Sequence, residues 1–274
     1  MVKIYTDTNV LRYFGEAFAT VSVPQEIAVQ LLLAPLAMLE LLSQLGTADA
    51  EDAFAAVQAL PRVHNPAACG MLPWSDDFFR ICLFQQAPGK DSVTQSINNA
   101  VNNVLNATND AELTTDGAEM RALLDAGKNE AVDNFTNLIA SAKAEGKLGP
   151  SDDRRIFAQS IARRAGVDPA SVDVDFVLTH LDAHYRFEQQ RINAAIDNPE
   201  YNVRKRANDV YDAELLIYLA DPSLHLLTCD TGFKRVGDSS QAGRIHIVPA
   251  DALRVADTAV TTLKKLVESS EGGV

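Results

Sequence analysis

The chain has 274 residues, of which 47% are hydrophobic and 22% are charged, and its formal net charge is −13. This composition is typical of a globular protein with a hydrophobic core, built as one large domain or as one domain with a sizeable insertion. The negative charge excludes a chain that binds nucleic acid over its whole surface, because affinity for phosphate comes mainly from Lys and Arg.

The sequence predicts neither a membrane span nor a signal peptide. The richest apolar run, residues 29–42, is interrupted by Pro35 and Glu40, so it is a poor membrane segment. The start of the chain reaches Asp7 too early for a signal peptide. The cysteines are few and odd in number, which predicts buried thiols in a reducing compartment: Cys69, Cys82 and Cys229. We therefore expect a cytoplasmic protein with no membrane partner.

The first predicted strand ends at an acid. Residues 2–6 are rich in β-forming side chains and predict a short strand, which Asp7 follows. Asp7 or Thr8 can cap a helix over residues 10–14. An acid therefore stands at the carboxyl end of the first strand.

The next segment predicts helices around an ambiguous apolar run. Residues 24–29 predict a short helix, and residues 31–33 fit either a strand or a helix. Pro35 fits the first turn of the following helix, which contains Glu40. A second acid thus lies at the edge of an apolar segment.

The middle of the chain, residues 47–198, is predicted to be mostly helical and contains no internal repeat. Ala-rich stretches over residues 48–60 and 119–147 have the apolar spacing of helices. Residues 98–110 are rich in Asn and predict a polar helix.

The last part of the chain alternates helix and strand. Residues 211–220 predict an apolar helix with Asp212 near its first turns, and residues 224–229 predict a strand that Asp230 follows. Residues 244–248 predict another strand before a final helix. This alternation predicts an α/β fold with a parallel sheet, in which ligands bind outside the carboxyl ends of the strands.

Acids at strand ends and on facing helices can converge in space although they are far apart in the sequence. Converging carboxylates repel one another, so such a cluster usually needs a bound cation. Basic groups flank three of the acids: Arg12 follows Asp7, residues 203–206 precede Asp212, and Lys234 and Arg235 follow Asp230. Each basic group alone is typical of a solvated surface, but together they suit a phosphodiester substrate.

Four short motifs follow one another in the chain. They are Asp-Thr-Asn at residues 7–9, Glu40 on an early helix, Asp-Ala at residues 212–213 opening a late apolar helix, and Thr-x-Asp-x-x-Phe at residues 228–233. In order and local context they resemble the PIN-domain ribonuclease family. The resemblance covers roughly residues 1–60 and 200–265.

The resemblance implies a three-layer α/β/α sandwich with a central, mainly parallel sheet. A discontinuous PIN-like domain would be formed by residues 1–64 and 200–274, with a large α-helical insertion at residues 65–199. Small toxin-type members of the family are near half this length and have no counterpart of the insertion. The insertion could cover the site, form a substrate channel or bind a partner.

The resemblance also implies Mg²⁺ or Mn²⁺ and cleavage of RNA phosphodiester bonds. Four acids would form the catalytic and metal-binding set, with the glutamate acting through water: Asp7, Glu40, Asp212 and Asp230. Three neighbours would orient carboxylates or water: Thr8, Asn9 and Thr228. Basic residues would meet the phosphate: Arg12, Lys205 or Lys234. RNA is expected rather than DNA only through the resemblance.

Each acid also has a structural interpretation. Asp7 alone is typical of a helix cap, and Asp212 alone is a favourable charge near a helix N-terminus. Asp209 and Glu214 compete for the role of Asp212, and Asp209 is nearer to the same face of the helix.

Two further groups of residues favour structural roles. His180 and His184 have the spacing of a zinc pair on a predicted helix, but no third ligand is evident. An aromatic segment could stack on bases, although it is more typical of the core of the helical region: Trp74, Phe78, Phe79, Arg80 and Phe84.

The expected function is a metal-dependent endoribonuclease, and the resemblance makes a homodimer a plausible assembly. Two alternatives stay open. One is a non-catalytic PIN-like scaffold whose helical region binds protein or RNA. The other is the toxin of a toxin–antitoxin pair, whose partner would be an antitoxin.

Overall fold

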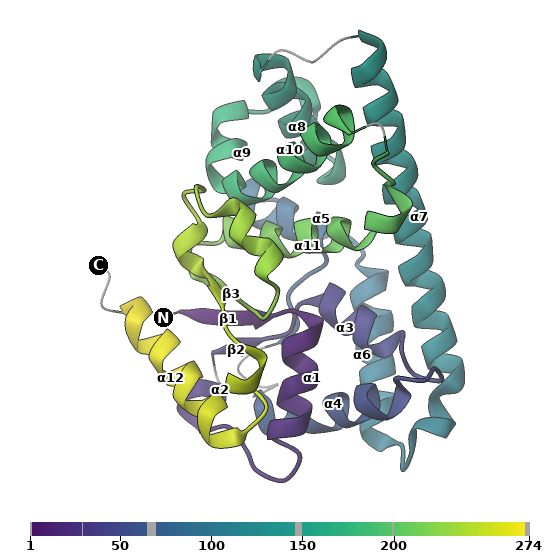
Figure 1. Ribbon diagram of the computed structural model, residues 1–274, viewed down its shortest axis with the longest axis vertical. Helices are drawn as coiled ribbons and strands as arrows, with labels where there is room; N and C mark the ends of the chain where they lie inside the picture. Colours follow the sequence, from purple (N-terminus) through teal and green to yellow (C-terminus); the bar gives the residue numbers. More distant parts are fainter. Residues whose placement is uncertain (1, 29, 65–69, 146–149, 199, 272–274) are drawn as a thin grey trace.

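The computed structural model describes residues 2–28, 30–64, 70–145, 150–198 and 200–271, and places a small sheet among many helices (Figure 1). The strands are β1 (Lys3–Thr6), β2 (Leu31–Leu32), β3 (Leu224–Thr228) and β4 (Ile245–Ile247). The α-helices are α1 (Thr8–Ala17), α2 (Gln25–Ala28), α3 (Pro35–Leu42), α4 (Ala50–Val63), α5 (Ser75–Phe78), α6 (Ser92–Asn106), α7 (Thr114–Glu145), α8 (Pro150–Arg164), α9 (Val174–His180), α10 (Asp182–Asp197), α11 (Asn208–Leu216) and α12 (Ala256–Glu271). Short 3₁₀ or π turns are η1 (Phe79–Leu83), η2 (Asp110–Leu113), η3 (Pro169–Ser171), η4 (Arg204–Arg206), η5 (Ile217–Ala220), η6 (Thr231–Val236), η7 (Ala242–Arg244) and η8 (Ala250–Ala252).

The sheet is parallel and brings the two ends of the sequence together. Its strand order is β2-β1-β3-β4, and every neighbouring pair runs parallel. Tyr5 pairs with Leu32 on one side and with Leu226 on the other. The prediction of a mixed α/β fold with a parallel sheet is confirmed, and the ambiguous run at residues 31–33 supplies β2.

Apolar side chains bury both faces of the sheet. In β1, Ile4 belongs to one apolar cluster and Tyr5 to another, because successive side chains of a strand point to opposite faces. The same alternation separates Leu31 from Leu32 in β2. The Ile4 cluster includes side chains of α1, α2 and α12, and the Tyr5 cluster includes side chains of α3, α11 and the helical middle.

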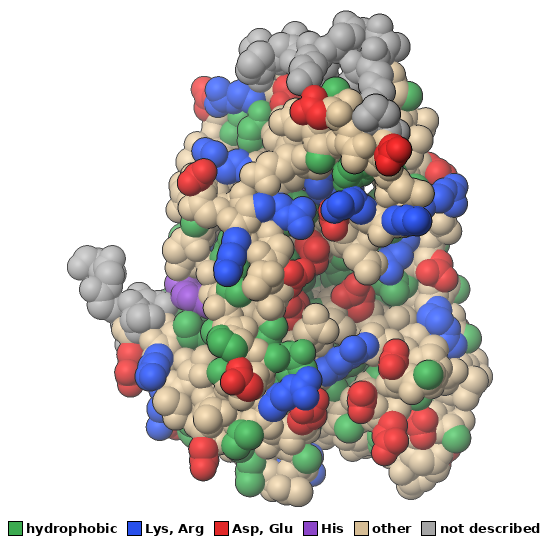
Figure 2. Space-filling model, in the orientation of Figure 1, with side chains coloured by type: hydrophobic (Ala, Val, Ile, Leu, Met, Phe, Trp, Pro, Cys, Tyr) green, Lys and Arg blue, Asp and Glu red, His purple; other side chains and the backbone are tan. Residues whose placement is uncertain are grey.

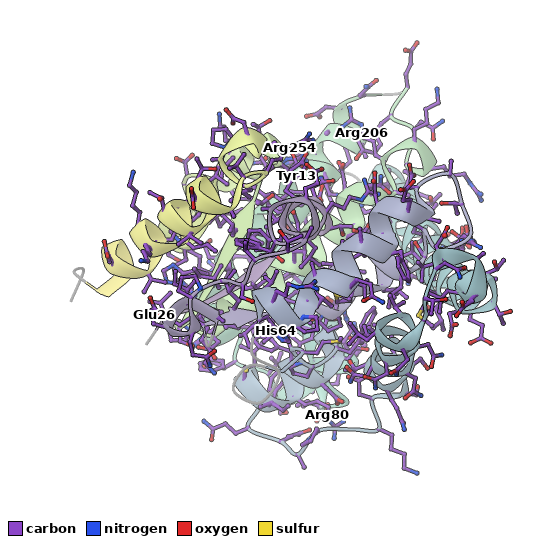
Figure 3. The ribbon with its side chains drawn as sticks, turned by 90° about the horizontal axis from the view of Figure 1, so that it is seen from below. Tyr13, Glu26, His64, Arg80, Arg206 and Arg254 are labelled. Carbon is purple, nitrogen blue, oxygen red and sulfur yellow. The ribbon has the colours of Figure 1, made fainter. Side chains whose placement is uncertain are left out.

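The last helix packs against the first. Just before α12, the guanidinium carbon of Arg254 lies 4.6 Å from the centroid of the Tyr13 ring in α1, and a nitrogen of Arg254 lies 3.8 Å from a carboxylate oxygen of Glu16. Figure 3 shows Arg254 and Tyr13 side by side at this junction. A cation over an aromatic face contributes about 0.5–1 kcal/mol at an exposed site, so the pair adds to the apolar packing.

Helices α4 to α10 lie in the middle of the chain, residues 47–198, which the sequence predicts to be mostly helical. We call α5 to α10 the helical region. Helix α7 runs along one side of the molecule, past α6 and up to α8 and α10 (Figure 1). The largest apolar cluster holds Leu36 and Leu226 of the α/β part together with Phe79, Ile97 and Phe187 of the helical region. The two parts therefore share one core.

The predicted domain boundaries, after residues 64 and 199, stay predictions, and residues 65 and 199 lie outside the described part. No helix among the described residues has the length and apolar character to cross a bilayer. Cys82 and Cys229 are half-buried free thiols, whereas Cys69 lies outside the described residues.

Two helix predictions need correction. The prediction of one helix through both histidines is wrong, because His180 ends α9, Leu181 has a φ of −118°, and His184 lies in the next helix. The apolar helix predicted over residues 211–220 begins earlier, at Asn208, and its last turn is the tighter η5.

Candidate active site

The four predicted acids come from four different elements. Asp7 follows β1, and Asp230 follows β3 after one intervening residue. Because β1 and β3 are parallel neighbours, their carboxyl ends lie at the same edge of the sheet. Glu40 belongs to α3 and Asp212 to α11, and these two helices pack against each other.

Asp7 is buried, with an exposed fraction of 7%, and it is the N-cap of α1. Its Oδ1 accepts a hydrogen bond of 2.8 Å from the Val10 backbone N–H, and its Oδ2 accepts one of 2.5 Å from the Thr228 hydroxyl. Burial raises the pKa of the Asp7 carboxyl and Asp230 raises it further, while the two hydrogen bonds act to lower it. Asp7 is thus a helix cap, and it also touches one of the three residues predicted to orient carboxylates.

Glu40 lies on α3, a helix that is otherwise almost entirely buried. The Thr8 hydroxyl donates a hydrogen bond of 2.5 Å to Oε2 of Glu40, which links α1 to α3. Burial raises the pKa of Glu40, the Thr8 hydroxyl and Lys128 lower it, Asp7 raises it, and Arg12 lowers it. Glu40 therefore lies within the electrostatic reach of both an acid and two cations.

Asp212 makes no hydrogen bond through its side chain to any described residue. Burial raises its pKa to about 7, and repulsion from Asp230, Asp209 and Glu40 contributes to this rise. A carboxyl group in this condition gains from any nearby cation, because a positive charge stabilises its ionised form.

The two competing acids of α11 are engaged with arginines. Glu214 forms bidentate hydrogen bonds of 2.7 and 2.8 Å with Arg164. Although burial acts to raise it, the guanidinium lowers the pKa of Glu214 to about 2. Asp209 lies 3.5 Å from Arg235 and 3.9 Å from Arg206. Asp212 is therefore the acid of α11 best placed to join the others.

Asp230 caps the turn η6. Its Oδ1 accepts a hydrogen bond of 2.6 Å from the Gly232 backbone N–H, and its own N–H donates one of 2.9 Å to the Thr228 hydroxyl oxygen. Since the same hydroxyl donates to Asp7, Thr228 holds the two acids in one hydrogen-bonded chain.

Each of the four acids is coupled by electrostatic repulsion to two of the others. Asp230 raises the pKa values of Asp7 and Asp212, Asp7 raises that of Glu40, and Glu40 raises that of Asp212. We call this set the acid ring: Asp7, Glu40, Asp212 and Asp230. In the described part of the chain, no three His, Cys, Asp or Glu side chains are arranged to hold one metal ion.

The donor chemistry of the acid ring nevertheless suits a hard divalent cation. Oε1 of Glu40, Oδ2 of Asp230 and both carboxylate oxygens of Asp212 make no hydrogen bond to any described residue. Mg²⁺ and Mn²⁺ prefer such oxygen ligands. A cation would also offset the repulsion among the carboxylates. The type of donor in the acid ring therefore suits the implied metal.

Three basic residues stand beside the acid ring, each from a different element. Arg12 of α1 and Lys128 of α7 both act on Glu40, and Arg235 of η6 acts on Asp212. The Nζ atom of Lys128 also lies 5.0 Å from the centroid of the Tyr211 ring. The sequence motifs indicate Arg12 but not Lys128, because Lys128 lies within a long helix that contains no motif. Arg235 is recognised in the sequence only as half of a basic pair, and its neighbour Lys234 is a predicted phosphate contact.

Three of the predicted site residues are not brought to the acids. Asn9 is exposed on α1, and Lys205 and Lys234 are exposed on short turns. None of the three side chains makes a hydrogen bond or ion pair with an acid-ring carboxylate in the described structure. Their predicted roles stay predictions.

The two groups for which the sequence favours structural roles have the following surroundings. His180 and His184 bond through Nδ1 to the carbonyl oxygens of Phe176 and Ala213, at 2.9 and 2.8 Å. In the aromatic segment, Phe78 and Phe79 are buried. The half-buried Trp74 lines a cavity.

Figure 2 shows how charge is distributed over the face that carries α11 and the ends of the strands. Acidic side chains gather in a hollow in the middle of this face, and Lys and Arg side chains lie on both sides of it (Figure 2). Although the net charge of the chain is negative, basic side chains therefore flank the acidic hollow on this face, an arrangement that suits a phosphodiester substrate.

Comparison of the chain with protein-family models, with curated proteins and with solved structures finds no match.

Proposed function

We propose that this protein is a metal-dependent endoribonuclease with a three-layer, PIN-like α/β fold and a large helical insertion. The observation that supports the proposal most strongly is the acid ring. Four carboxylates that the sequence selects by motif, from segments up to about 220 residues apart, repel one another in a closed circuit at the carboxyl edge of a parallel sheet.

Mg²⁺ or Mn²⁺ would be held by Asp7, Asp212 and Asp230, with Glu40 acting through water. When bound, the ion supplies an activated water and stabilises negative charge on the leaving oxygen. Thr228 fixes the Asp7 carboxylate by its hydrogen bond and accepts the N–H of Asp230, so the orientation of both ligands depends on one hydroxyl. Thr8 fixes Glu40 in the same way.

The basic residues beside the acid ring would meet the phosphates of the substrate. Arg12 and Lys128 act on Glu40 and Arg235 acts on Asp212, so positive charge from three elements is available near the carboxylates for a phosphate backbone. RNA is proposed rather than DNA because the four motifs resemble PIN-domain ribonucleases. A cytoplasmic location, a homodimer and a protein or antitoxin partner belong to the same proposal.

The test is cleavage of a labelled mixed RNA pool by the full chain in Mn²⁺, Mg²⁺ or EDTA. The Asp212→Asn variant should fold but lose metal-dependent cleavage. The Asp209→Asn variant, altered three residues earlier in α11, is the matched control and should retain it. Loss in the control with retention in Asp212→Asn would transfer the role to Asp209, and full activity of both variants would remove α11 from the mechanism.

A non-catalytic scaffold is the second candidate function. Two observations favour it: Asp7 and Asp230 already serve as caps, and no three acids in the described part are arranged to hold one metal ion. A folded chain that neither cleaves RNA nor binds Mn²⁺ by titration calorimetry would support the scaffold over the nuclease.

A further inference from the structure

A cavity of about 350 Å³ lies next to the acid ring, between α3, α7 and α11. Two of its wall residues immediately precede acids of the ring in the sequence: Leu39 precedes Glu40, and Tyr211 precedes Asp212. The Tyr211 hydroxyl donates a hydrogen bond of 2.6 Å to the Leu124 carbonyl oxygen, which fixes this wall to α7. The cavity and the acid ring are therefore neighbours that share two helices.

The lining of the cavity suits a flat ring with polar edges. Aromatic side chains of Trp74, Tyr211 and Tyr218 contribute to the wall, together with aliphatic side chains of α3 and α7. Ser75 and Asn134 add hydrogen-bonding groups. Pockets of this kind, a few hundred Å³ in volume and largely apolar with a few polar groups, are typical of small-ligand sites.

The charges in the cavity select against an anion inside it. Among the described lining residues, Arg164 is the only basic one, and its guanidinium already donates to Asp76, Ser75 and Glu214. Carboxylates of Asp76, Glu130 and Glu214 also line the space. A phosphate would be repelled there, whereas a neutral heterocycle would not.

A cation stands at the boundary between the cavity and the acid ring. Lys128 lies over the Tyr211 ring and lowers the pKa of Glu40, so its ammonium group is close to both places. This is where the phosphate of a nucleotide would lie if its base entered the cavity and the next phosphodiester reached the acids.

We propose that the cavity holds one unpaired nucleobase of the RNA strand whose phosphodiester lies at the acid ring. This inference rests on the proposed nuclease function and adds to it a site for one base, whose walls come in part from α5, α7 and α8 of the helical region. Stacking of a base on aromatic side chains accepts any sequence, because every base has a flat face. A paired base cannot enter, because its edges are occupied by its partner and its faces by the stack.

The cavity contains its own reporter, because Trp74 is the single tryptophan of the chain. Tryptophan fluorescence of the full chain in EDTA, where no cleavage occurs, can be followed during titration with the four nucleoside 5′-monophosphates, inorganic phosphate, a short single-stranded RNA and the corresponding duplex. We expect a saturable change with the single strand and with at least one nucleotide, and none with phosphate or duplex.

Matched variants of α7 test whether the fluorescence change comes from binding in the cavity. Ala131→Leu fills the cavity and should weaken nucleotide binding by about tenfold or more, because added methyl groups overlap with the bound ring. Ala126→Leu makes the same change at an exposed position outside the cavity and should bind normally. If Ala131→Leu folds poorly by circular dichroism, Gly127→Leu takes its place, since a Cβ at Gly127 meets nothing closer than the Tyr211 hydroxyl at 3.6 Å.

Absence of any saturable fluorescence change, or an unchanged response in both filled variants, would overturn the proposal. The outcome is separable from that of the nuclease test. A chain that cleaves RNA without a tryptophan response keeps the nuclease and loses the base site. A chain that binds nucleotides through this cavity but never cleaves keeps the base site and loses the nuclease.

Discussion

The hydroxyl of Thr228, the last residue of β3, donates a hydrogen bond to the carboxylate of Asp7, which follows β1. The same oxygen accepts the backbone N–H of Asp230. One side chain thus sets the positions of two acids that belong to neighbouring strands, and the parallel pairing of β1 with β3 brings all three residues to one edge.

Replacing Thr228 with Val should therefore weaken both the fold and the site. The variant leaves a buried carboxylate oxygen without its donor, which should lower the free energy of unfolding by about 1–3 kcal/mol. Urea unfolding followed by circular dichroism measures the change. Thr261→Val, at an exposed position of α12, is the matched control and should change stability by less than about 0.5 kcal/mol. Equal stability of the two variants would show that the hydrogen bond contributes nothing.

The pH dependence of stability should report on Asp212. Its pKa in the folded protein is about 7, above the ordinary value of 3.8. Folding therefore favours the protonated carboxyl, and this contribution is complete below about pH 4 and is lost as the pH rises through about 7. Asparagine cannot ionise, so Asp212→Asn does not lose this stability as the pH rises. The variant should therefore become more stable than the wild type as the pH is raised from about 5 to about 7.5.

The comparison of wild type with Asp212→Asn removes opposing contributions. Burial lowers the pKa values of His184, His225 and His246, which makes stability rise with pH in an overlapping range, but these residues are present in both proteins. Urea unfolding of both proteins at several pH values gives the difference directly. A difference that does not change with pH would contradict the raised pKa of Asp212.

Arg164 should be a sensitive position for stability. Arg164→Met leaves Glu214 and Asp76 without their partner, and we expect a loss of about 2–3 kcal/mol in the free energy of unfolding, because the site is only partly exposed. The exposed pair formed by Arg154 and Asp175 is the control, and Arg154→Met should cost less than about 1 kcal/mol. Similar losses in the two variants would rule out a special role for Arg164.

Two glycines of α7 should respond in opposite ways to alanine. A Cβ at Gly117 would lie 2.0 Å from the Leu45 carbonyl oxygen, so Gly117→Ala must push α7 away from the turn after α3. A Cβ at Gly127 would make only an ordinary contact of 3.6 Å with the Tyr211 hydroxyl, and alanine should stabilise the helix by about 0.5–1 kcal/mol. Thermal unfolding should show a lower Tm for Gly117→Ala and a higher one for Gly127→Ala. A raised Tm in both would disprove the close approach at Leu45.

Lys128 should contribute one phosphate contact to RNA binding. In EDTA, Lys128→Met should weaken binding of single-stranded RNA and reduce the slope of log affinity against log salt by about 0.7, the value for one contact to a single strand. Lys264→Met, on the exposed face of α12, should leave the slope unchanged. Fluorescence anisotropy over a range of salt concentrations measures both. An unaltered slope in Lys128→Met would remove this residue from the RNA contacts.

Much of the fold could be predicted from local patterns. The first strand, the cap at Asp7, the proline that starts α3 and the two late strands all depend on a few consecutive residues, and all are present. The parallel sheet follows from the alternation of helix and strand. The break between the histidines at 180 and 184 could not be predicted, because it depends on how α9 and α10 pack.

The acids of the candidate site could be selected from the sequence because each stands within a short motif. The basic residues could not be selected in the same way. Lys128 reaches Glu40 only because α7 packs on α3, and Arg235 rather than Lys234 faces Asp212 because of the turn of η6. The cavity also escaped prediction, since its lining comes from α3, α5, α7, α8, α11 and η5.

The pairing of β1 with β3 has a consequence for the order in which the protein is made. β1 leaves the ribosome before its partner β3, which begins 218 residues after β1 ends. At usual rates of synthesis this delay is roughly 10–40 s. During that interval one edge of β1 is unpaired while the helices between the two strands are synthesised. Asp7 and Glu40 are then present, but Asp212 and Asp230 have not yet been made. The four acids come together only after β3 and Asp230 have left the ribosome.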